Sequence, residues 1–416
     1  MSSILLILTQ KYPYANGESF LANELEYIPD RFDEIVIYPM LICKQDDCLE
    51  WKYRKPLDQR ISVIRGTEFY RKRNILRHAL RSVFSKDFWR ELNHLGKEKR
   101  LTAGNLKLLL LYMMRCRYGE RVVCRNVFRR LSPADTVSVY SYWMDYDAYT
   151  ACLLKRKYSQ SITSCITRCH RGDLYEEAAR GGYLPMRRVI LTETDRICSI
   201  SDDGLCYLRR RYPAWIRDNL SVSRLGTPDY GMAVPADRDS LRVVSCSWVR
   251  KVKRVQLIAG ALKAVNFRVS WTHYGSGPEM DALEEAVRSI NNPAVECCLR
   301  GECRNEEVLR EYRQHGYQVF INVSEHEGVP VSIMEAMSFG MIVIATDVGG
   351  TRELIEEGRN GYLLEKDAAG EQLAERLKQL SLKSREELAA MSARSREIWR
   401  EKYAAQTNYP AFYEYL

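Results

Sequence analysis

Short apolar runs, each followed by a polar loop and a helix-like segment, constrain the fold of this chain more than any other feature. The run Ser3–Thr9 ends in a Gly-containing loop, residues 12–18, and the run Glu34–Pro39 comes next. The order strand, loop, helix, strand is the repeating unit of a parallel α/β sheet. The apolar residues between the two runs have the spacing of one helix face: Phe20, Leu21, Leu25 and Ile28.

Strand-like runs of this kind fall into two groups. The first group is residues 3–9, 34–39, 136–140, 164–167 and 196–200, and the second is 241–246, 267–272, 294–299, 319–322 and 341–345. A stretch rich in Gly, Pro and Asp, residues 225–240, separates them. A chain of 416 residues is too long for one ordinary core. We therefore predict an α/β protein of two Rossmann-like, doubly wound domains that face a central cleft outside the carboxyl ends of their strands.

The grouping also predicts the domain boundaries. Residues 1–225 form the first domain and residues 226–394 the second. Residues 395–416 are helical, add no strand, and are expected to pack back on the first domain. Residues 66–130 contain no strand-like run, so we expect a helical insertion there in the first domain.

The insertion carries most of the positive charge of the chain. Residues 70–130 contain 17 Lys and Arg against 4 Asp and Glu, a net +13, whereas the whole chain carries +9. Such a concentration favours docking on an anionic lipid surface, where each basic residue contributes about 1 kcal/mol. A set of solvated helices and a site for an acidic glycan are the alternatives. Nucleic acid is not the expected partner, because no recognised binding module surrounds the charge.

The cysteines and apolar runs exclude several classes of protein. The 13 cysteines are an odd number in a long chain, so reduced thiols are expected. Cys165, Cys169 and His170 lack a fourth ligand, and no metal site is predicted. The run Ile4–Leu8 is too short for a signal peptide, and no run is long enough to cross a membrane. We expect a cytoplasmic protein and leave open whether it docks on the inner face of the cytoplasmic membrane.

The segment from Ser324 to Gly340 carries the chemistry of the second half. It follows an apolar run and passes through a Gly-Val-Pro loop into a helix-like stretch, with Glu327 on the loop and Glu335 in the helix. A carboxylate among Ile, Met and Ala is costly unless it holds a polar partner, and two vicinal sugar hydroxyls suit it. The loop before a helix also presents free N–H groups to a diphosphate.

With this segment the sequence resembles the retaining glycosyltransferases of family 4, which have the GT-B fold. Glu327 and Glu335 reproduce the E-x7-E motif of that family. The similarity continues through the glycine turns at residues 275–279 and 344–353. It is good over residues 241–416, fair over 135–225, weak over 1–40, and lapses between about 45 and 130.

The resemblance implies roles for particular residues. Glu335 would hold the donor ribose, and Glu327 would lie against the transferred sugar. His170 matches a histidine that contacts the donor sugar near the reaction centre, and Tyr142 and Asp145 would line the acceptor side. The remaining donor-binding residues implied are Gly17, Gly301, Gly328, Val329 and Pro330.

A cluster of cations after residue 246 suits a diphosphate leaving group. In the family an arginine precedes a lysine by five or six residues. Lys253 matches the lysine, but Ser247 and Trp248 occupy the arginine positions. The candidates to replace it, with the first preferred, are Arg250, Lys251 and Arg254.

The function implied is transfer of a hexose-type sugar from a nucleotide-diphosphate sugar to a glycan or lipid-linked saccharide. The resemblance implies retention of the anomeric configuration and no cofactor or metal ion. Catalysis would rest on Glu327, His170 and Lys253. The alternatives are a nucleotide-sugar epimerase, a sugar phosphorylase, and a catalytically degenerate, membrane-associated assembly partner.

Overall fold

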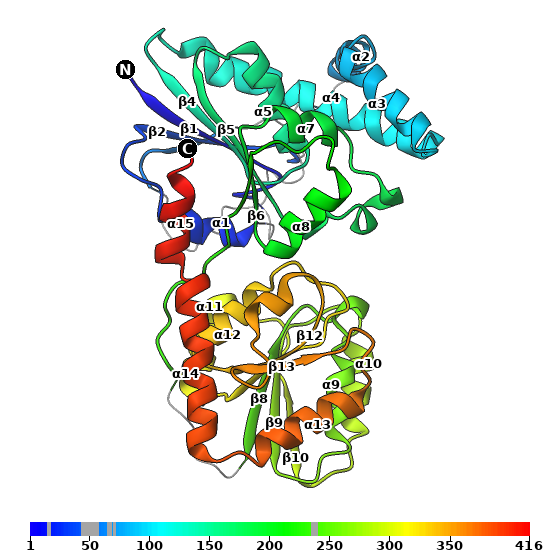
Figure 1. Cartoon of the computed structure of the whole chain (residues 1–416), viewed down its shortest axis with the longest axis vertical. Coiled ribbons are helices and arrows are strands. Elements are labelled where there is room, and N and C mark those ends of the chain that lie inside the picture. The colour runs from blue at the N-terminus through cyan, green and yellow to red at the C-terminus, as the bar shows by residue number, and fades with distance from the viewer. Residues whose placement is uncertain (15–17, 43–57, 65–68, 70–71, 234–239) are drawn as a thin grey trace. The chain divides into compact units, whose positions relative to one another are not determined.

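A computed structural model describes residues 1–14, 18–42, 58–64, 69, 72–233 and 240–416 (Figure 1). The chain divides into two compact units, Met1–Ser223 with Tyr409–Leu416, and Arg224–Asn408. Each unit is built on a parallel sheet with helices on both faces. The prediction of two Rossmann-like α/β domains is therefore confirmed.

The sheet of the first unit has the strand order β3-β2-β1-β4-β5-β6-β7. The strands are β1 (Ser3–Thr9), β2 (Glu34–Pro39), β3 (Ile61–Val63), β4 (Thr136–Ser141), β5 (Ile162–Cys169), β6 (Arg196–Ser199) and β7 (Leu220–Val222). All neighbouring pairs are parallel. β1 pairs with both β2 and β4. From β1 the chain adds β2 and β3 on one side, and then crosses to add β4 to β7 on the other, so the direction of winding reverses between β1 and β4.

The continuous apolar sequence of β1 fits this central place, because both faces of the sheet are covered. Ile4, Leu6 and Leu8 belong to the core beneath α4 (Ala103–Asn126) and α5 (Tyr146–Lys157). The alternate residues Leu5 and Ile7 pack on the other face with α1 (Ser19–Leu25) and the end of α15 (Ala405–Tyr413). The shorter helices are α6 (Arg171–Leu174), α7 (Arg187–Glu193) and α8 (Asp202–Arg211).

The basic segment is helical, as predicted, over its described part. It forms α2 (Lys72–Val83), α3 (Lys86–Lys97) and α4, and Figure 1 shows the three helices together at one side of the first unit. Met114 and Val123 of α4 pack against the sheet. α4 is thus part of the layer that covers the sheet, which corrects the predicted extent of the insertion. Within the described residues no helix is long and apolar enough to cross a membrane.

The sheet of the second unit has the order β10-β9-β8-β11-β12-β13. The strands are β8 (Leu241–Cys246), β9 (Val269–Tyr274), β10 (Val295–Leu299), β11 (Val319–Asn322), β12 (Ile342–Thr346) and β13 (Gly361–Leu364). They too are parallel throughout. Here the order reverses between β8 and β11.

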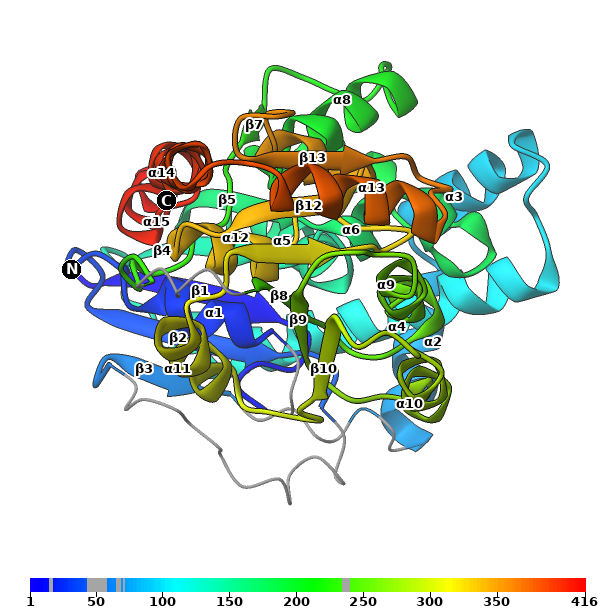
Figure 2. The ribbon, with the colours of Figure 1, turned by 90° about the horizontal axis from the view of Figure 1, so that it is seen from below.

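Two layers of helices cover this second sheet. α9 (Gln256–Leu262) lies between α10 (Met280–Arg288) and α13 (Gly370–Ser381), and the three share one apolar core with the sheet (Figure 2). α12 (Val331–Ser338) packs against β11, β12 and α14 (Arg385–Lys402). α11 (Asn305–His315) precedes β11.

The end of the chain differs from the prediction. α14 packs on α12 and β12, so it belongs to the second unit, and only residues 409–416 belong to the first. Within that tail, Phe412 is fully buried. The guanidinium carbon of Arg168 lies over the Phe412 ring, 4.0 Å from the ring centre. Arg168 is itself buried and paired with the carboxylate of Glu24. The chain therefore returns to the first unit, as predicted, but from residue 409 and not from residue 395.

Candidate functional site

The carboxyl ends of β8 and β11 bring two of the predicted residues into direct contact. Lys253 ends a short 3-10 helix after β8, and Glu327 lies on the loop after β11. The Lys253 Nζ donates to Glu327 Oε1 at 2.6 Å, and Asn322 Nδ2 lies 3.4 Å from the same oxygen. These strands flank the point where the strand order reverses, which is where open α/β sheets bind their ligands. The pair therefore occupies the expected place for a site in the second unit.

Glu335 lies on the next helix, α12, and is buried. Its Oε1 accepts a hydrogen bond from Asn305 Nδ2 at 3.0 Å. Cys246, at the end of β8, has its pKa raised to about 12 by burial and then by the charge of Glu335. The Cys246 thiol is therefore protonated at neutral pH, and it is a packing residue and not a nucleophile. α12 thus carries one buried carboxylate, that of Glu335, at the position expected from the sequence.

A glycine turn at Gly349 and Gly350 packs against the loop that carries Glu327. Gly349 has φ 54°, and a Cβ built there would lie 2.1 Å from the carbonyl oxygen of Glu327. Gly350 N donates to Gly328 O at 2.7 Å. The backbone of the turn can approach the loop this closely only without a side chain. Val329 and Pro330 are buried, and Pro330 immediately precedes the first turn of α12.

A second glycine turn lies at the end of β9. Gly275 has φ 132°, and a Cβ there would lie 1.9 Å from the carbonyl oxygen of Ser247. Its N–H donates to Gly301 O at 2.8 Å. Gly301 itself has φ 70° and open space around it. The two turns thus bring the loops after β8, β9 and β10 together beside Lys253.

The three candidates for the missing arginine differ in what they contact. Arg254 Nε donates to Val323 O at 2.8 Å, so this guanidinium ties the end of β11 to the loop after β8. Arg250 is exposed, and its guanidinium lies 3.4 Å from the ring centre of Trp248. Lys251 is exposed. Arg254 is thus used in a structural contact. Arg250 is held in place by the Trp248 ring, and none of its described contacts is a carboxylate.

His170 lies at the carboxyl end of β5 in the first unit. It is buried against Tyr142 and Trp143, with ring centres 4.9 and 4.5 Å away. Neither ring nitrogen has a hydrogen-bond partner within the described residues. Burial, and then the charge of Arg168, lower the pKa of His170 to about 3. The imidazole is neutral at physiological pH, and both of its ring nitrogens are enclosed by the surrounding side chains.

The two residues predicted to face an acceptor lie after β4. Tyr142 is fully buried, so it packs against His170 and contributes no open surface. Asp145 is partly exposed, and Gln10 Nε2 lies 3.4 Å from its Oδ2. Burial raises the pKa of Asp145 to about 6 despite the opposing charge of Arg187. Asp145 therefore remains the candidate of the two that a ligand can reach.

Glu18 was not among the site residues predicted from the sequence. Its carboxylate accepts hydrogen bonds from the backbone N–H groups of Gln10, Lys11 and Tyr12, at 2.8, 2.7 and 2.5 Å. Trp143 Nε1 also donates to it at 2.5 Å. Glu18 thus joins the loops after β1 and β4, where the strand order of the first sheet reverses. A carboxylate directly after the Gly-containing loop was the signal that could have identified it.

Two further predictions concern Gly17 and the absence of a metal site. Gly17 lies outside the described residues. Within the described residues, no group of three or more His, Cys, Asp or Glu side chains is placed to hold a metal ion. Cys165 and Cys169, considered above as ligands, are both buried thiols.

Known proteins resemble part of this chain in sequence. Residues 241–382 match the family model described as glycosyl transferases group 1. The putative colanic acid biosynthesis glycosyltransferase WcaL of Escherichia coli K12 is 41% identical over 240 residues, 55% of this chain and 58% of WcaL. The GtfA subunit of the UDP-N-acetylglucosamine–peptide N-acetylglucosaminyltransferase of Streptococcus agalactiae is 27% identical over 135 residues. The match covers 32% of this chain and 26% of GtfA.

The fold resembles solved structures over its whole length. The Anabaena protein HepE, crystallised in complex with UDP, has a TM-score of 0.65 at 14% sequence identity. The similarity covers 100% of this chain and 99% of HepE. At this identity the likeness shows the fold alone, which is the two-domain GT-B fold. That the two domains face a common cleft stays a prediction.

Proposed function

We propose, from the match of residues 241–382 to the group 1 glycosyl transferases, that this chain transfers a sugar from a nucleotide-diphosphate sugar to a saccharide acceptor. The observation that carries the proposal is the Lys253–Glu327 pair at the strand-order reversal of the second sheet, with Glu335 on the helix that follows. The three side chains supply a cation for a diphosphate and two carboxylates for hydroxyl groups.

In the proposed reaction each residue has one task. Glu335 accepts hydrogen bonds from the two ribose hydroxyls of the donor. Lys253 and the first-turn N–H groups of α12 stabilise the negative charge that develops on the diphosphate as it leaves. Glu327, held by Lys253, lies against the transferred sugar. Arg250 adds a second cation from the same loop.

We further propose that the anomeric configuration is retained. The departing phosphate takes the proton of the acceptor hydroxyl on the face from which it leaves. The neutral imidazole of His170 donates or accepts one hydrogen bond with a sugar hydroxyl, which a cationic side chain would do less selectively. No metal ion takes part, because Lys253 and the α12 amides carry its electrostatic task.

Donor binding tests the proposal directly. Calorimetric titration with UDP-, GDP-, ADP- and dTDP-glucose should find one nucleotide that binds. Glu335→Gln keeps the shape of the side chain but removes its charge, so binding of that donor should weaken about tenfold or more. Glu296→Gln, exposed on β10, is the matched control and should bind as the wild type does. If the wild type binds none of the four nucleotide sugars, the proposal is refuted.

Product analysis then separates transfer from the other reactions of nucleotide sugars. With a lipid-extracted saccharide as acceptor, the wild type should release nucleotide diphosphate only when acceptor is present. An epimerase would convert the sugar without release. NMR of the product gives the anomeric configuration, and an inverted linkage would contradict the retaining mechanism.

We also propose that α2 and the start of α3 dock on an anionic lipid surface. Leu76, Leu80 and Phe84 follow one another at intervals of four, which places them on one side of α2, and all three are exposed. Trp89 of α3 is exposed as well. Single exposed apolar residues are ordinary, but a row of large ones beside basic side chains is typical of helices that lie on a membrane.

The charges beside this row support an anionic surface as its partner. Arg77, Arg81 and Lys86 have no ion-pair partner among the described residues. The other basic residues of the segment include several that are engaged, such as Arg100 with Glu176 and Arg130 with Glu34. Arg77, Arg81 and Lys86 thus supply unpaired cations next to the exposed apolar row.

A further inference from the structure

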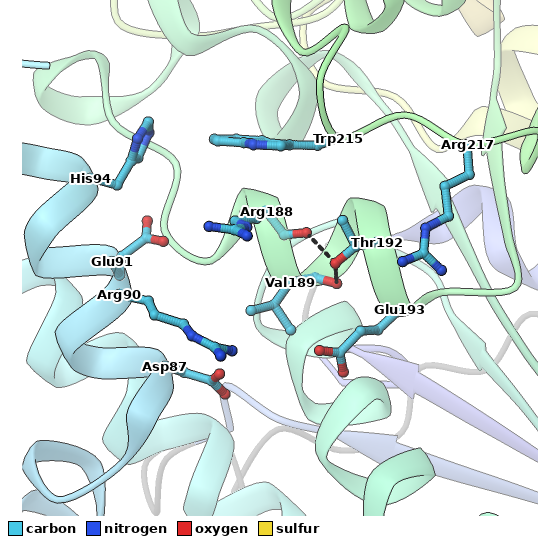
Figure 3. Close-up of a pocket in the computed structure, with 10 residues that line it drawn as sticks. All are labelled: Asp87, Arg90, Glu91, His94, Arg188, Val189, Thr192, Glu193, Trp215 and Arg217. Carbon is cyan, nitrogen blue, oxygen red and sulfur yellow. Dashed lines mark hydrogen bonds between the residues drawn. The ribbon is translucent and has the colours of Figure 1, made fainter. Parts of the chain in front are cut away.

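A hollow of about 190 Å³ lies in the first unit, and none of the residues proposed above for the donor site lines it. It is bordered by α3, by α7 and by the loop between α8 and β7 (Figure 3). A buried water needs about 10–15 Å³ of such space, so the hollow can hold a ligand of many atoms. Eight of its ten lining residues are polar or charged, which favours a ligand with polar groups.

The carboxylates of the hollow already have partners. Asp87 accepts hydrogen bonds from Tyr149 Oη at 2.9 Å and from Arg156, and Arg156 Nε also binds Glu193 at 2.6 Å. Glu91 accepts from Tyr183 Oη at 2.9 Å and from the N–H of Met186, and burial raises its pKa. Asp87 and Glu193 are thus neutralised by Arg156, and Glu91 is held by two neutral donors.

The arginines of the hollow have no such partners. Arg90, Arg188 and Arg217 are exposed, and within the described part of the chain no carboxylate pairs with them. Figure 3 shows them on three sides of the hollow, Arg90 from α3, Arg188 from α7 and Arg217 from the loop. With Arg156 included, the arginines exceed the carboxylates by one even when every carboxylate is ionised. The hollow therefore has unused guanidinium groups for an anion.

Trp215 adds a flat apolar surface to the same hollow. Tyr212 stacks on its ring, with centres 5.3 Å apart and planes 14° apart, and His94 meets it edge-on at 5.1 Å. These contacts fix the indole and leave its other face for a ligand. Figure 3 shows the ring seen edge-on next to Arg188. A rigid aromatic face beside guanidinium groups suits a ring with C–H groups and an acidic substituent.

We propose that this hollow binds an acidic saccharide unit, a sugar that carries a carboxylate or a phosphate. The sugar ring lies on Trp215, and its acidic group receives hydrogen bonds from Arg188 and Arg217. The choice of a saccharide over other acids rests on the proposed function, because an acceptor glycan is the source of such a unit. The site deepens that function by assigning part of the acceptor to the first unit.

Calorimetry without any donor tests the site. Tetragalacturonate is the probe, and maltotetraose, which has no carboxylates, is its neutral counterpart. At low salt the wild type should bind the acid, and Arg188→Gln/Arg217→Gln should weaken that binding about tenfold or more. Trp215→Ala should weaken it as well. Arg209→Gln/Arg210→Gln, exposed on α8 outside the hollow, is the matched control and should bind as the wild type does.

Several results would overturn the site. They are no binding of tetragalacturonate by the wild type, equal binding by the Arg188/Arg217 double variant, and equal binding of maltotetraose. Displacement of the tetrasaccharide by an equal concentration of inorganic phosphate would show a simple anion site and would also overturn it. Nucleotide-sugar binding by the same double variant should be unchanged, so a failure here is distinguishable from a failure of the donor site.

Discussion

At the scale of single residues, burial decides the charge of His170. A solvent-exposed histidine has a pKa near 6.5, but the enclosed imidazole stays neutral down to a pH of about 3. Below pH 6.5 the unfolded chain therefore takes up a proton that the folded chain does not. The contribution of this residue to stability falls as the pH falls from 6.5 towards 3.

Replacing His170 by glutamine makes this contribution measurable. His170→Gln removes the titrating group, so the difference in the free energy of unfolding between wild type and variant depends on pH. We expect the wild type to lose roughly 2 kcal/mol relative to the variant between pH 6.5 and pH 5. Urea unfolding of both proteins at several pH values measures it. A difference that stays constant over this range would contradict a neutral His170.

The sequence identified candidate residues for the site, but it did not reveal which of them are in contact. Glu327, Glu335 and Lys253 were chosen from sequence motifs, and the structure places all three around the ends of β8 and β11. The bond from Lys253 to Glu327 joins residues 74 positions apart. Only the strand order, which puts β8 beside β11, brings them together. Glu18 was missed for the same reason, since its bond to Trp143 depends on β1 lying beside β4.

At the scale of elements, long apolar runs were predictable and short ones were not. All ten predicted strands are present, with shifts of a few residues, as in β9 at Val269–Tyr274 against 267–272. β3, β7 and β13 were missed, because three or four residues give too little pattern to recognise. The prediction for α1 was wrong at Phe20, which is exposed, whereas Leu21, Leu25 and Ile28 are buried as expected.

The lipid-docking face of α2 belongs to this scale as well. Leu80→Ser/Phe84→Ser removes two exposed apolar side chains and leaves every basic residue in place. Because these side chains would enter the interface, and full burial of each contributes about 1.5–3 kcal/mol, binding to vesicles should fall about tenfold or more. Co-sedimentation with vesicles of phosphatidylcholine and phosphatidylglycerol measures it.

The same assay can separate the contribution of the basic residues to vesicle binding from that of the apolar row. Vesicles of phosphatidylcholine alone should bind the wild type weakly, because they lack the anionic headgroups. Leu382→Ser removes an exposed leucine of the second unit and is the control. Equal sedimentation of the wild type with both kinds of vesicle, or no loss in the Leu80/Phe84 variant, would contradict lipid docking and favour a protein partner for this face.

At the scale of the whole molecule, the chain passes from the first unit to the second after Ser223 and returns after Asn408. Sequence patterns could not locate the return, because the apolar residues of α14 could cover either sheet. The contacts decide it: Trp399 of α14 donates its indole N–H to Thr227 at 2.8 Å, and Phe412 packs in the first unit.

Phe412→Ala should therefore destabilise the first unit although the residue lies at the far end of the chain. Loss of a fully buried phenylalanine ring costs about 3–5 kcal/mol. Hydrogen exchange should show faster amide exchange in β1 and β4 and little change in β8 and β11. Tyr415→Ala, at an exposed position of the same tail, should have a smaller effect. A loss of protection confined to the second unit would contradict the assignment of the tail.

The return of the chain also sets an order of events during translation. The ribosome makes every strand of the first sheet before it starts the second unit, yet residues 409–416 emerge only after that unit is complete. Until then Arg168, paired with Glu24, has no Phe412 ring beneath it, and the face of the nascent sheet that α1 covers lacks Phe412 and Tyr413. The unit that is synthesised first is thus the one that finishes folding last.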